Sequence, residues 1–227
     1  MKRTTTSIST QPLNKAVFLD RDGTINSDEG HYYIYKPEDF VFNPGVIEGL
    51  KRLQKAGYLL IVITNQGGIA KGIYTREDMF KVHEKMCAEL EKHGVTLTKI
   101  YYCPHHESIK TCVCRKPSPY MVNLAIEEFH IDKKRSWFIG DSSKDVKCAE
   151  DAGVKPLRIR KNQDIVRVSE IYHFPVCKKV VHLLQINIGE KRRYRKPCHC
   201  SVFFRNNMPR KVHILLTQYP IKHSIQH

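Results

Sequence analysis

The stretch AVFLDRDGTIN, residues 16–26, decides the fold expected of this chain. Its first four residues are apolar, which is typical of a buried strand. Asp20 and Asp22 follow, and Gly23 lets the backbone turn sharply after them. Ligands of open α/β sheets bind beyond the carboxyl ends of the strands, so both aspartates are candidates for chemistry. On these residues alone, a strand that ends in an acidic turn explains the stretch equally well.

Strand and helix patterns alternate as far as about residue 160. Further strands are predicted at 58–63, 100–102, 137–139 and 157–159. Helices are expected from Asn43-Pro44 to Gly57, from Thr75 to Gly94, from 118 to 130, and up to residue 152. Residues 26–42 predict a loop or small hairpin over the strand ends. This alternation predicts an α/β fold with a doubly wound parallel sheet and right-handed crossovers.

Polar motifs lie just past the predicted strand ends, where parallel strands bring them to one edge of the sheet. Asp20 is a candidate nucleophile, because a carboxylate can form an aspartyl phosphate. Asp22 can protonate a leaving oxygen and then accept a proton from water. Thr64 and Lys116 can bind a phosphoryl group. Asp20 and Asp141 offer hard oxygen ligands suited to Mg²⁺, and Asp145, one helical turn later, can support them.

These motifs resemble those of the haloacid-dehalogenase-like phosphatases. The resemblance covers residues 16 to about 160 and includes Asp-x-Asp-Gly-Thr at 20–24, Thr64, Lys116 and Gly-Asp-x-x-x-Asp at 140–145. Within that superfamily the chain is most similar to the heptose bisphosphate phosphatases. The stretches that carry this narrower resemblance are residues 20–26, TNQGGIAKG at 64–72, YYCPHH at 101–106 and CRKP at 114–117.

The resemblance implies a role for each site residue and a small phosphorylated sugar as substrate. Asp20 would be the nucleophile and Asp22 the acid and base, while Thr64 and Lys116 would stabilise the phosphoryl group. Mg²⁺ would be held by Asp20, the backbone carbonyl of Asp22, and Asp141. The expected substrate-binding residues are Asp28, Glu29, Gly30, His31, Asn65, Gln66, Gly67, Arg115 and Ser142. The activity implied is removal of the C7 phosphate, a step towards nucleotide-activated heptose for lipopolysaccharide.

The same family carries a zinc loop, and its ligands match Cys103, His105, Cys112 and Cys114. Three thiolates and one imidazole make a closed tetrahedral site, so the implied Zn²⁺ is structural. The loop continues into Arg115 and Lys116, so a bound Zn²⁺ that fixes the loop would also direct both positive charges towards a phosphate. Between the motifs the chain has room for one strand–helix unit at a time, so no large cap domain is expected.

The positive charge of the chain is unevenly distributed. The net charge is +15, and residues 166–227 hold 12 Lys and Arg against two acids. We therefore expect a phosphatase domain at 1–165 and a basic C-terminal appendage at 166–227, in which Cys198-His199-Cys200 is an incomplete metal motif. The first 15 residues lack the apolar core of a secretory signal, and no apolar run approaches the roughly 20 residues of a membrane span. A cytoplasmic monomer with no membrane partner is expected.

Two other functions remain open. Only six residues separate the two ligand pairs of the metal loop. This short loop is similar to that of histidinol-phosphate phosphatases. The basic appendage allows a nucleic-acid-end phosphatase or binder. Against nucleic acid, residues 1–165 carry no recognisable nucleic-acid-binding motif, and charge in a tail is weak evidence by itself.

Overall fold

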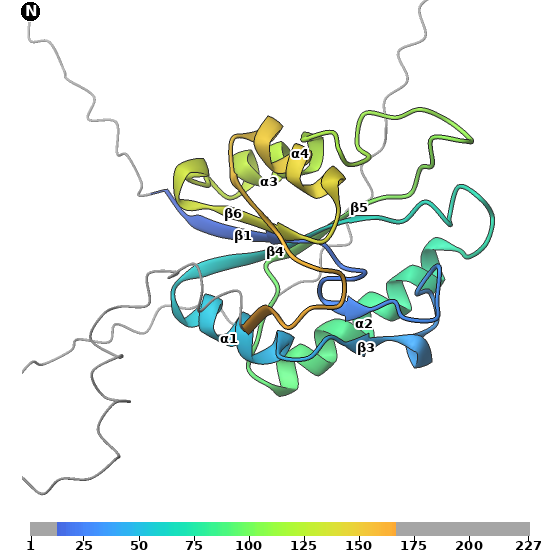
Figure 1. The fold of residues 1–227 in the computed structure, drawn as a ribbon, viewed down its shortest axis with the longest axis horizontal. Helices are drawn as coiled ribbons and strands as arrows, with labels where there is room; N and C mark the ends of the chain where they lie inside the picture. The colour runs from blue at the N-terminus through green and yellow to red at the C-terminus, as the bar shows by residue number, and fades with distance from the viewer. Residues whose placement is uncertain (1–12, 167–227) are drawn as a thin grey trace, which may run out of the picture. The chain divides into compact units, whose positions relative to one another are not determined.

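A five-stranded parallel sheet forms the centre of the computed structural model, which describes residues 13–166 (Figure 1). The strands lie in the order β5-β4-β1-β6-β7. They are β1 (Lys15–Leu19), β4 (Tyr58–Asn65), β5 (Lys99–Cys103), β6 (Trp137–Gly140) and β7 (Lys155–Arg158). The predicted strands are confirmed, with small differences at their ends. The expectations for residues 167–227, including the metal motif at 198–200, lie outside the described residues.

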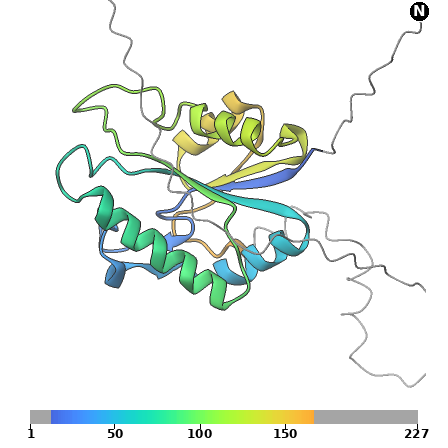
Figure 2. The ribbon, with the colours of Figure 1, turned by 180° about the vertical axis from the view of Figure 1, so that it is seen from behind.

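Helices cover both faces of this sheet, as expected for a doubly wound fold (Figures 1 and 2). One face carries α1 (Val46–Lys55) and α2 (Arg76–Lys92), and the other carries α3 (Tyr120–Glu128) and α4 (Ser143–Ala152). A short 3-10 helix, Lys133–Arg135, precedes β6. Alternate residues of β1 enter the two cores, with Val17 and Leu19 on the side of α1 and Phe18 on the side of α3. Burial on both faces explains why β1 is a continuous apolar run.

Residues 26–42 form the small hairpin expected over the strand ends. β2 (Asn26–Ser27) pairs antiparallel with β3 (Val41–Phe42), and a 3-10 helix, Pro37–Asp39, lies between them. Within the described part of the chain, this hairpin and α1 are the elements that separate β1 from β4. A large cap domain is therefore absent from this interval, as predicted.

One helix cap follows the predicted residue and another differs from it. Thr75 caps α2 in a capping box with Asp78, as the sequence indicates. The prediction for α1 was wrong, because the helix begins at Val46 and its cap is Gly45, with φ 73°. Asn43 is instead buried, and its side-chain amide donates to the Thr24 carbonyl at 3.1 Å. The residue therefore ties the hairpin to the loop after β1 rather than capping the helix.

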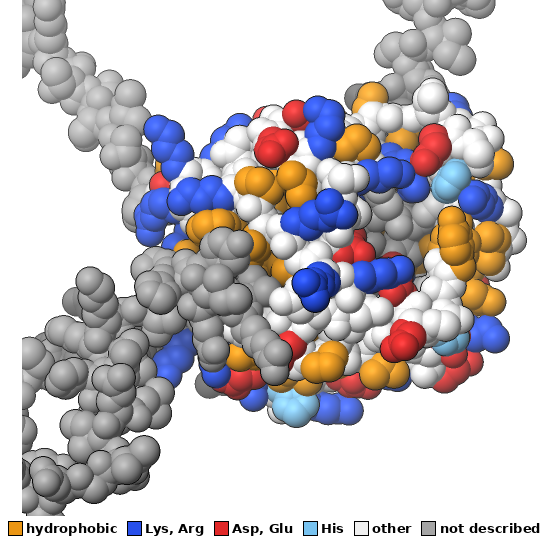
Figure 3. All heavy atoms as spheres, in the orientation of Figure 1, with side chains coloured by type: hydrophobic (Ala, Val, Ile, Leu, Met, Phe, Trp, Pro, Cys, Tyr) orange, Lys and Arg blue, Asp and Glu red, His pale blue; other side chains and the backbone are white. Residues whose placement is uncertain are grey.

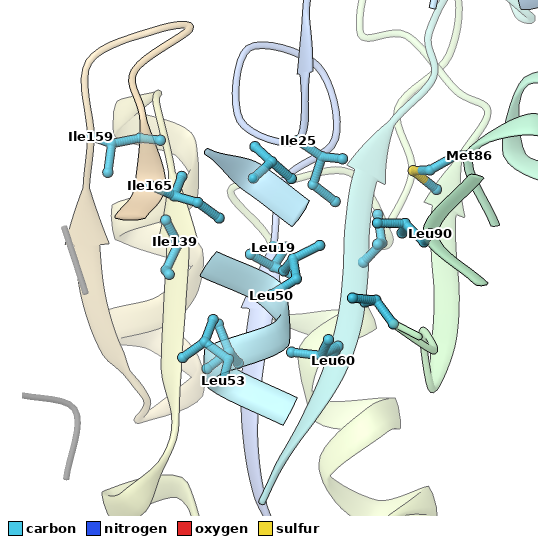
Figure 4. Close-up of a cluster of buried hydrophobic side chains, with 14 of the residues drawn as sticks. Leu19, Ile25, Leu50, Leu53, Leu60, Met86, Leu90, Ile139, Ile159 and Ile165 are labelled. Atoms are coloured by element: carbon cyan, nitrogen blue, oxygen red, sulfur yellow. The ribbon is translucent and has the colours of Figure 1, made fainter. Parts of the chain in front are cut away.

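The described chain ends in a segment that completes the core on the α1 face. Ile159 and Ile165 are almost fully buried there, in the same cluster as Leu50 and Ile139 (Figure 4). Gly49 of α1 makes room for this packing, since a Cβ at that position would lie 2.8 Å from Ile165. In the described residues, no helix is long and apolar enough to cross a membrane.

Ile165→Ala tests whether the folded domain extends to this residue. Removing a buried Ile side chain leaves a cavity, so we expect a loss of about 2–5 kcal/mol in the free energy of unfolding. Chemical denaturation measures the change. Ile109→Ala is the matched control, because Ile109 is 61% exposed and surface truncations change stability by about 0.5 kcal/mol or less. Equal stability of the two variants would contradict this account of the core.

Candidate active site

Lys116 lies at the centre of the site, with 2% of its side chain exposed. Its ammonium lies 2.8 Å from Asp20 Oδ1 and 2.6 Å from Asp145 Oδ1. It also donates to the Ile63 carbonyl at 2.8 Å. Burial alone would lower the pKa of Lys116, but the two carboxylates outweigh it and the pKa is raised. The ammonium is therefore permanently charged and fixed beside the predicted nucleophile.

Asn65 holds the backbone of Lys116 in place. Its side-chain oxygen accepts from the Lys116 N–H at 3.0 Å, and its NH₂ donates to the Lys116 carbonyl at 3.1 Å. Asn65 is the last residue of β4, so these two bonds attach the loop at 112–117 to the edge of the sheet. The sequence predicted Asn65 as a substrate-binding residue, and the structure gives it this clamping contact.

Three carboxylates converge beside Lys116. Asp20, Asp141 and Asp145 each offer one carboxylate oxygen, and these three oxygens lie within 4.8 Å of one another. Burial and the neighbouring Asp145 carboxylate raise the pKa values of both Asp20 and Asp141. Lys116 alone does not balance this charge, and hard oxygen donors in such a cluster fit a divalent cation such as Mg²⁺. In the orientation of Figure 1, acidic side chains lie in the middle of the face, with Lys and Arg around them (Figure 3).

Two glycines let these carboxylates approach. Gly23 has φ 79°, and a Cβ there would lie 2.8 Å from Asp141 Oδ2. At Gly140 a Cβ would lie 2.5 Å from the Asp145 carboxyl group. Ser142 caps α4 and binds Asp145 Oδ2 through both its hydroxyl and its N–H, at 2.6 and 3.1 Å. The structure thus uses Ser142, predicted to bind substrate, to fix Asp145.

Asp22 lies in a separate hydrogen-bond network. Arg21 binds both of its carboxylate oxygens, at 3.0 and 2.9 Å, and Asn26 and Gln66 each donate to it at 3.1 Å. Gln66 is almost fully buried and also donates to Thr64 Oγ1 at 2.8 Å. Its own oxygen accepts from Tyr74 at 2.7 Å. Gln66, predicted to line the pocket, therefore connects two catalytic candidates.

The predicted zinc ligands come together in the loop that follows β5. The thiols of Cys103, Cys112 and Cys114 are free, and their sulfur atoms are 3.2 to 3.6 Å apart. His105 Nδ1 lies 3.3 Å from the Cys114 sulfur. Ligands held tetrahedrally about 2.3 Å from an ion are roughly 3.8 Å apart, so the four residues fit Zn²⁺. Hydrogen bonding with Cys103 and His105 lowers the pKa of the Cys114 thiol, which favours the thiolate form.

Arg115 and Lys116 line a cavity of about 350 Å³, together with residues of this loop. Its Nε lies 2.5 Å from Glu107 Oε2, and its Nη1 donates to the His105 carbonyl at 3.0 Å. Gly67 lies against the same side chain, since a Cβ there would be 3.1 Å from Arg115 Nη1. The guanidinium is therefore positioned by the loop rather than free in solvent.

The remaining predicted substrate residues lie at the end of β2. Glu29, Gly30 and His31 are exposed there. Asp28 is paired with Lys161 at 2.6 Å and also contacts Asn162. Sequence reasoning missed Lys161, because it comes from a segment more than a hundred residues away. It also missed Arg21, whose signal was available: a charged residue directly between two aspartates at the end of a buried strand.

The fold and this arrangement define the chain as a haloacid-dehalogenase-like phosphatase, a phosphoric monoester hydrolase. A family model described as "Polynucleotide kinase 3 phosphatase" matches residues 15–164, and the chain belongs to this family.

Two relatives are D-glycero-manno-heptose-1,7-bisphosphate 7-phosphatases, and the chain belongs among them. The β-named protein of Haemophilus ducreyi is 46% identical over 147 residues, 62% of this chain and 80% of the relative. The α-named protein of Campylobacter jejuni is 44% identical over 143 residues, 63% and 80% of the two chains. A crystal structure of the D,D-heptose 1,7-bisphosphate phosphatase from B. bronchiseptica, complexed with magnesium and phosphate, has a TM-score of 0.62 at 29% identity, covering 69% of this chain and 86% of that one.

Asn65→Ala tests the clamp on Lys116. Losing both bonds should cost about 1–2 kcal/mol of stability, whereas a displaced Lys116 should lower kcat/KM by roughly tenfold or more. Steady-state kinetics and chemical denaturation measure the two effects. Asn123→Ala on α3 is the control for loss of an Asn side chain. An Asn65→Ala enzyme with unchanged kcat/KM would contradict the positioning role.

Proposed function

We propose that this protein is a Mg²⁺-dependent phosphatase that removes the C7 phosphate of D-glycero-D-manno-heptose 1,7-bisphosphate. The observation that carries the chemistry is the buried Lys116 ammonium, 2.8 Å from the Asp20 carboxylate at the carboxyl end of β1. A phosphoryl group bound at this point would meet a nucleophile and a fixed positive charge together. The substrate follows from the names of relatives at 44 and 46% identity.

In the proposed reaction, an Asp20 oxygen attacks the C7 phosphorus, and Asp22 gives its proton to the sugar oxygen as the P–O bond breaks. A water molecule then attacks the aspartyl phosphate, gives a proton to Asp22, and frees Asp20 and phosphate. Lys116 and Thr64 hold the phosphoryl oxygens. Mg²⁺, held by Asp20, the Asp22 carbonyl and Asp141, would neutralise charge on the phosphoryl group.

In this proposal, the residues around the opening of the site select the substrate. A bisphosphate carries a second phosphate away from the bond that is cleaved, and the Arg115 guanidinium fork suits such a group. The hairpin residues 28–31, with Gly67 behind Arg115, would complete the sugar pocket. The structural Zn²⁺ would hold the loop that carries Arg115.

A second candidate is a nucleic-acid 3′-phosphatase, because the description of the matching family model names that activity. A groove of about 830 Å³ beside Asp141 is lined by Arg158, Arg160 and Lys161, a charge suited to a polyanion. These cations equally suit the second phosphate of a sugar, and the two candidates differ in the size of substrate they accept.

A phosphate-release assay tests the proposal. The panel holds the α and β anomers of heptose 1,7-bisphosphate, histidinol phosphate, and a 3′-phosphorylated oligonucleotide, each with Mg²⁺. We expect kcat/KM for one bisphosphate anomer to exceed the values for the other two compound classes by at least about tenfold. Faster release from histidinol phosphate or the oligonucleotide would replace the heptose assignment by that alternative.

Arg115→Ala tests recognition of the second phosphate. A lost charged hydrogen bond should cost the bisphosphate about 1.5–3 kcal/mol in transition-state binding. A singly phosphorylated heptose lacks that group and should lose much less. Comparing kcat/KM for the two sugars measures the difference. An equal loss on both would assign Arg115 to the phosphate that is cleaved.

Cys114→Ser tests the structural zinc. Losing one thiolate should release Zn²⁺, lower the thermal midpoint and lower activity together, because the same loop carries Lys116. Metal analysis by mass spectrometry and thermal unfolding measure these changes. Cys87→Ser is the matched control, since Cys87 is a free thiol on α2 outside the metal cluster. Wild-type protein purified without zinc would rule out this role.

A further inference from the structure

Arg21 is completely buried, although it lies in the turn between the two catalytic aspartates. Its Nε donates to Asp22 Oδ1 at 3.0 Å and its Nη2 to Asp22 Oδ2 at 2.9 Å. These parallel bonds form a fork that fixes the plane of the carboxylate. A buried guanidinium is costly unless its donors are satisfied, so its remaining contacts show what holds it there.

His83 on α2 supplies one of those contacts. Arg21 Nη1 lies 3.1 Å from His83 Nε2, and Nη2 also donates to the Ile34 carbonyl at 2.7 Å. A guanidinium can only donate, so the bond to His83 requires an unprotonated Nε2 and a neutral ring with its proton on Nδ1. His83 is 4% exposed. Burial and the charge of Arg21 lower its pKa well below the usual value, consistent with this tautomer.

We propose that His83 and Arg21 are positioning residues for Asp22: His83 fixes the guanidinium, and the guanidinium fixes the carboxyl group that transfers protons. Asn26 and Gln66 complete the set, each donating to one Asp22 oxygen at 3.1 Å. The inference rests on the proposed function, in which Asp22 acts in both steps. It assigns a catalytic consequence to a helix residue that touches neither substrate nor the reacting atoms.

Formation and hydrolysis of the aspartyl phosphate depend differently on the position of Asp22, and this difference provides the test. An alkyl phosphate needs a proton on its leaving oxygen, whereas 4-nitrophenolate leaves without one. Formation of the aspartyl phosphate should therefore suffer with the sugar and not with 4-nitrophenyl phosphate. Its hydrolysis needs Asp22 to accept a proton from water with either substrate. A general structural defect would instead impair both substrates alike.

The experiment compares His83→Leu, His83→Gln and Met86→Leu in the full-length Mg²⁺-loaded enzyme. Leu removes the acceptor, and Gln restores one at a similar position. Met86 is a fully buried core residue of the same helix, so its variant controls for disturbance of α2. Arg21→Lys is added because it keeps the charge and loses the fork. Arg21 is fully buried and its replacement can unfold the protein, so the His83 pair decides the outcome.

For His83→Leu we expect kcat/KM with the alkyl substrate to fall at least about tenfold. With 4-nitrophenyl phosphate, kcat and KM should fall together, kcat/KM should stay within about threefold, and a burst of nitrophenolate should precede the steady state. His83→Gln should recover most of the loss. The proposal would be overturned by an equal loss of kcat/KM with both substrates in His83→Leu, or by no loss with either. It would also be overturned if His83→Gln did not recover kcat/KM with the alkyl substrate.

A readout independent of turnover separates this inference from the proposed function. The ¹⁵N shifts of His83 should identify a neutral ring protonated on Nδ1 in the wild type. If the wild type releases phosphate only from another alkyl phosphate of the panel, the same comparison is made with that compound, and the heptose assignment fails alone. A His83 ring protonated on Nε2 would overturn the positioning role whatever the substrate.

Discussion

The contact of the buried Lys116 ammonium with Asp20 and Asp145 is the interaction on which the site depends. Removing one partner from a buried ion pair typically costs about 3–5 kcal/mol, because the other charge is left uncompensated in a dry environment. The Lys116 ammonium pairs with two carboxylates at once and donates a third hydrogen bond to the Ile63 carbonyl. The group that would stabilise a transferring phosphoryl is thus also needed to hold the nucleophile and its neighbours together.

The order of the strands explains how this contact arises. β1 lies in the middle of the sheet, between β4 and β6, so Asp20 has a strand end on each side of it. β4 ends in Asn65, which clamps Lys116. β6 is followed by Asp141, and Asp145 lies in the first turn of α4. The loop that follows β5 brings Lys116 to the same edge of the sheet. Residues distant in the chain meet because parallel strands present all their carboxyl ends at one edge.

Much of this could be predicted from the sequence, because the signals were local. Apolar runs that lead into Asp20 and Asp141 predicted two of the strands and the residues at their ends, and Thr75 predicted a helix cap. Tertiary contacts account for what was missed. Asn43 is a residue type that commonly caps helices, but its side-chain amide donates to the loop after β1, and Gly45 is the cap of α1. Lys161 pairs with Asp28, but Lys161 follows the last strand of the sheet in the chain, so no local pattern indicates the contact.

The central claim is that Asp20, held beside Lys116, becomes phosphorylated during turnover. Rapid acid quench of the enzyme with substrate and Mg²⁺, followed by peptide mass spectrometry, tests it most directly. A phosphoryl group on the peptide carrying Asp20, absent from Asp20→Asn, is the predicted result. Sustained phosphate release with no phosphorylated Asp20, or release that survives in Asp20→Asn, would contradict the account.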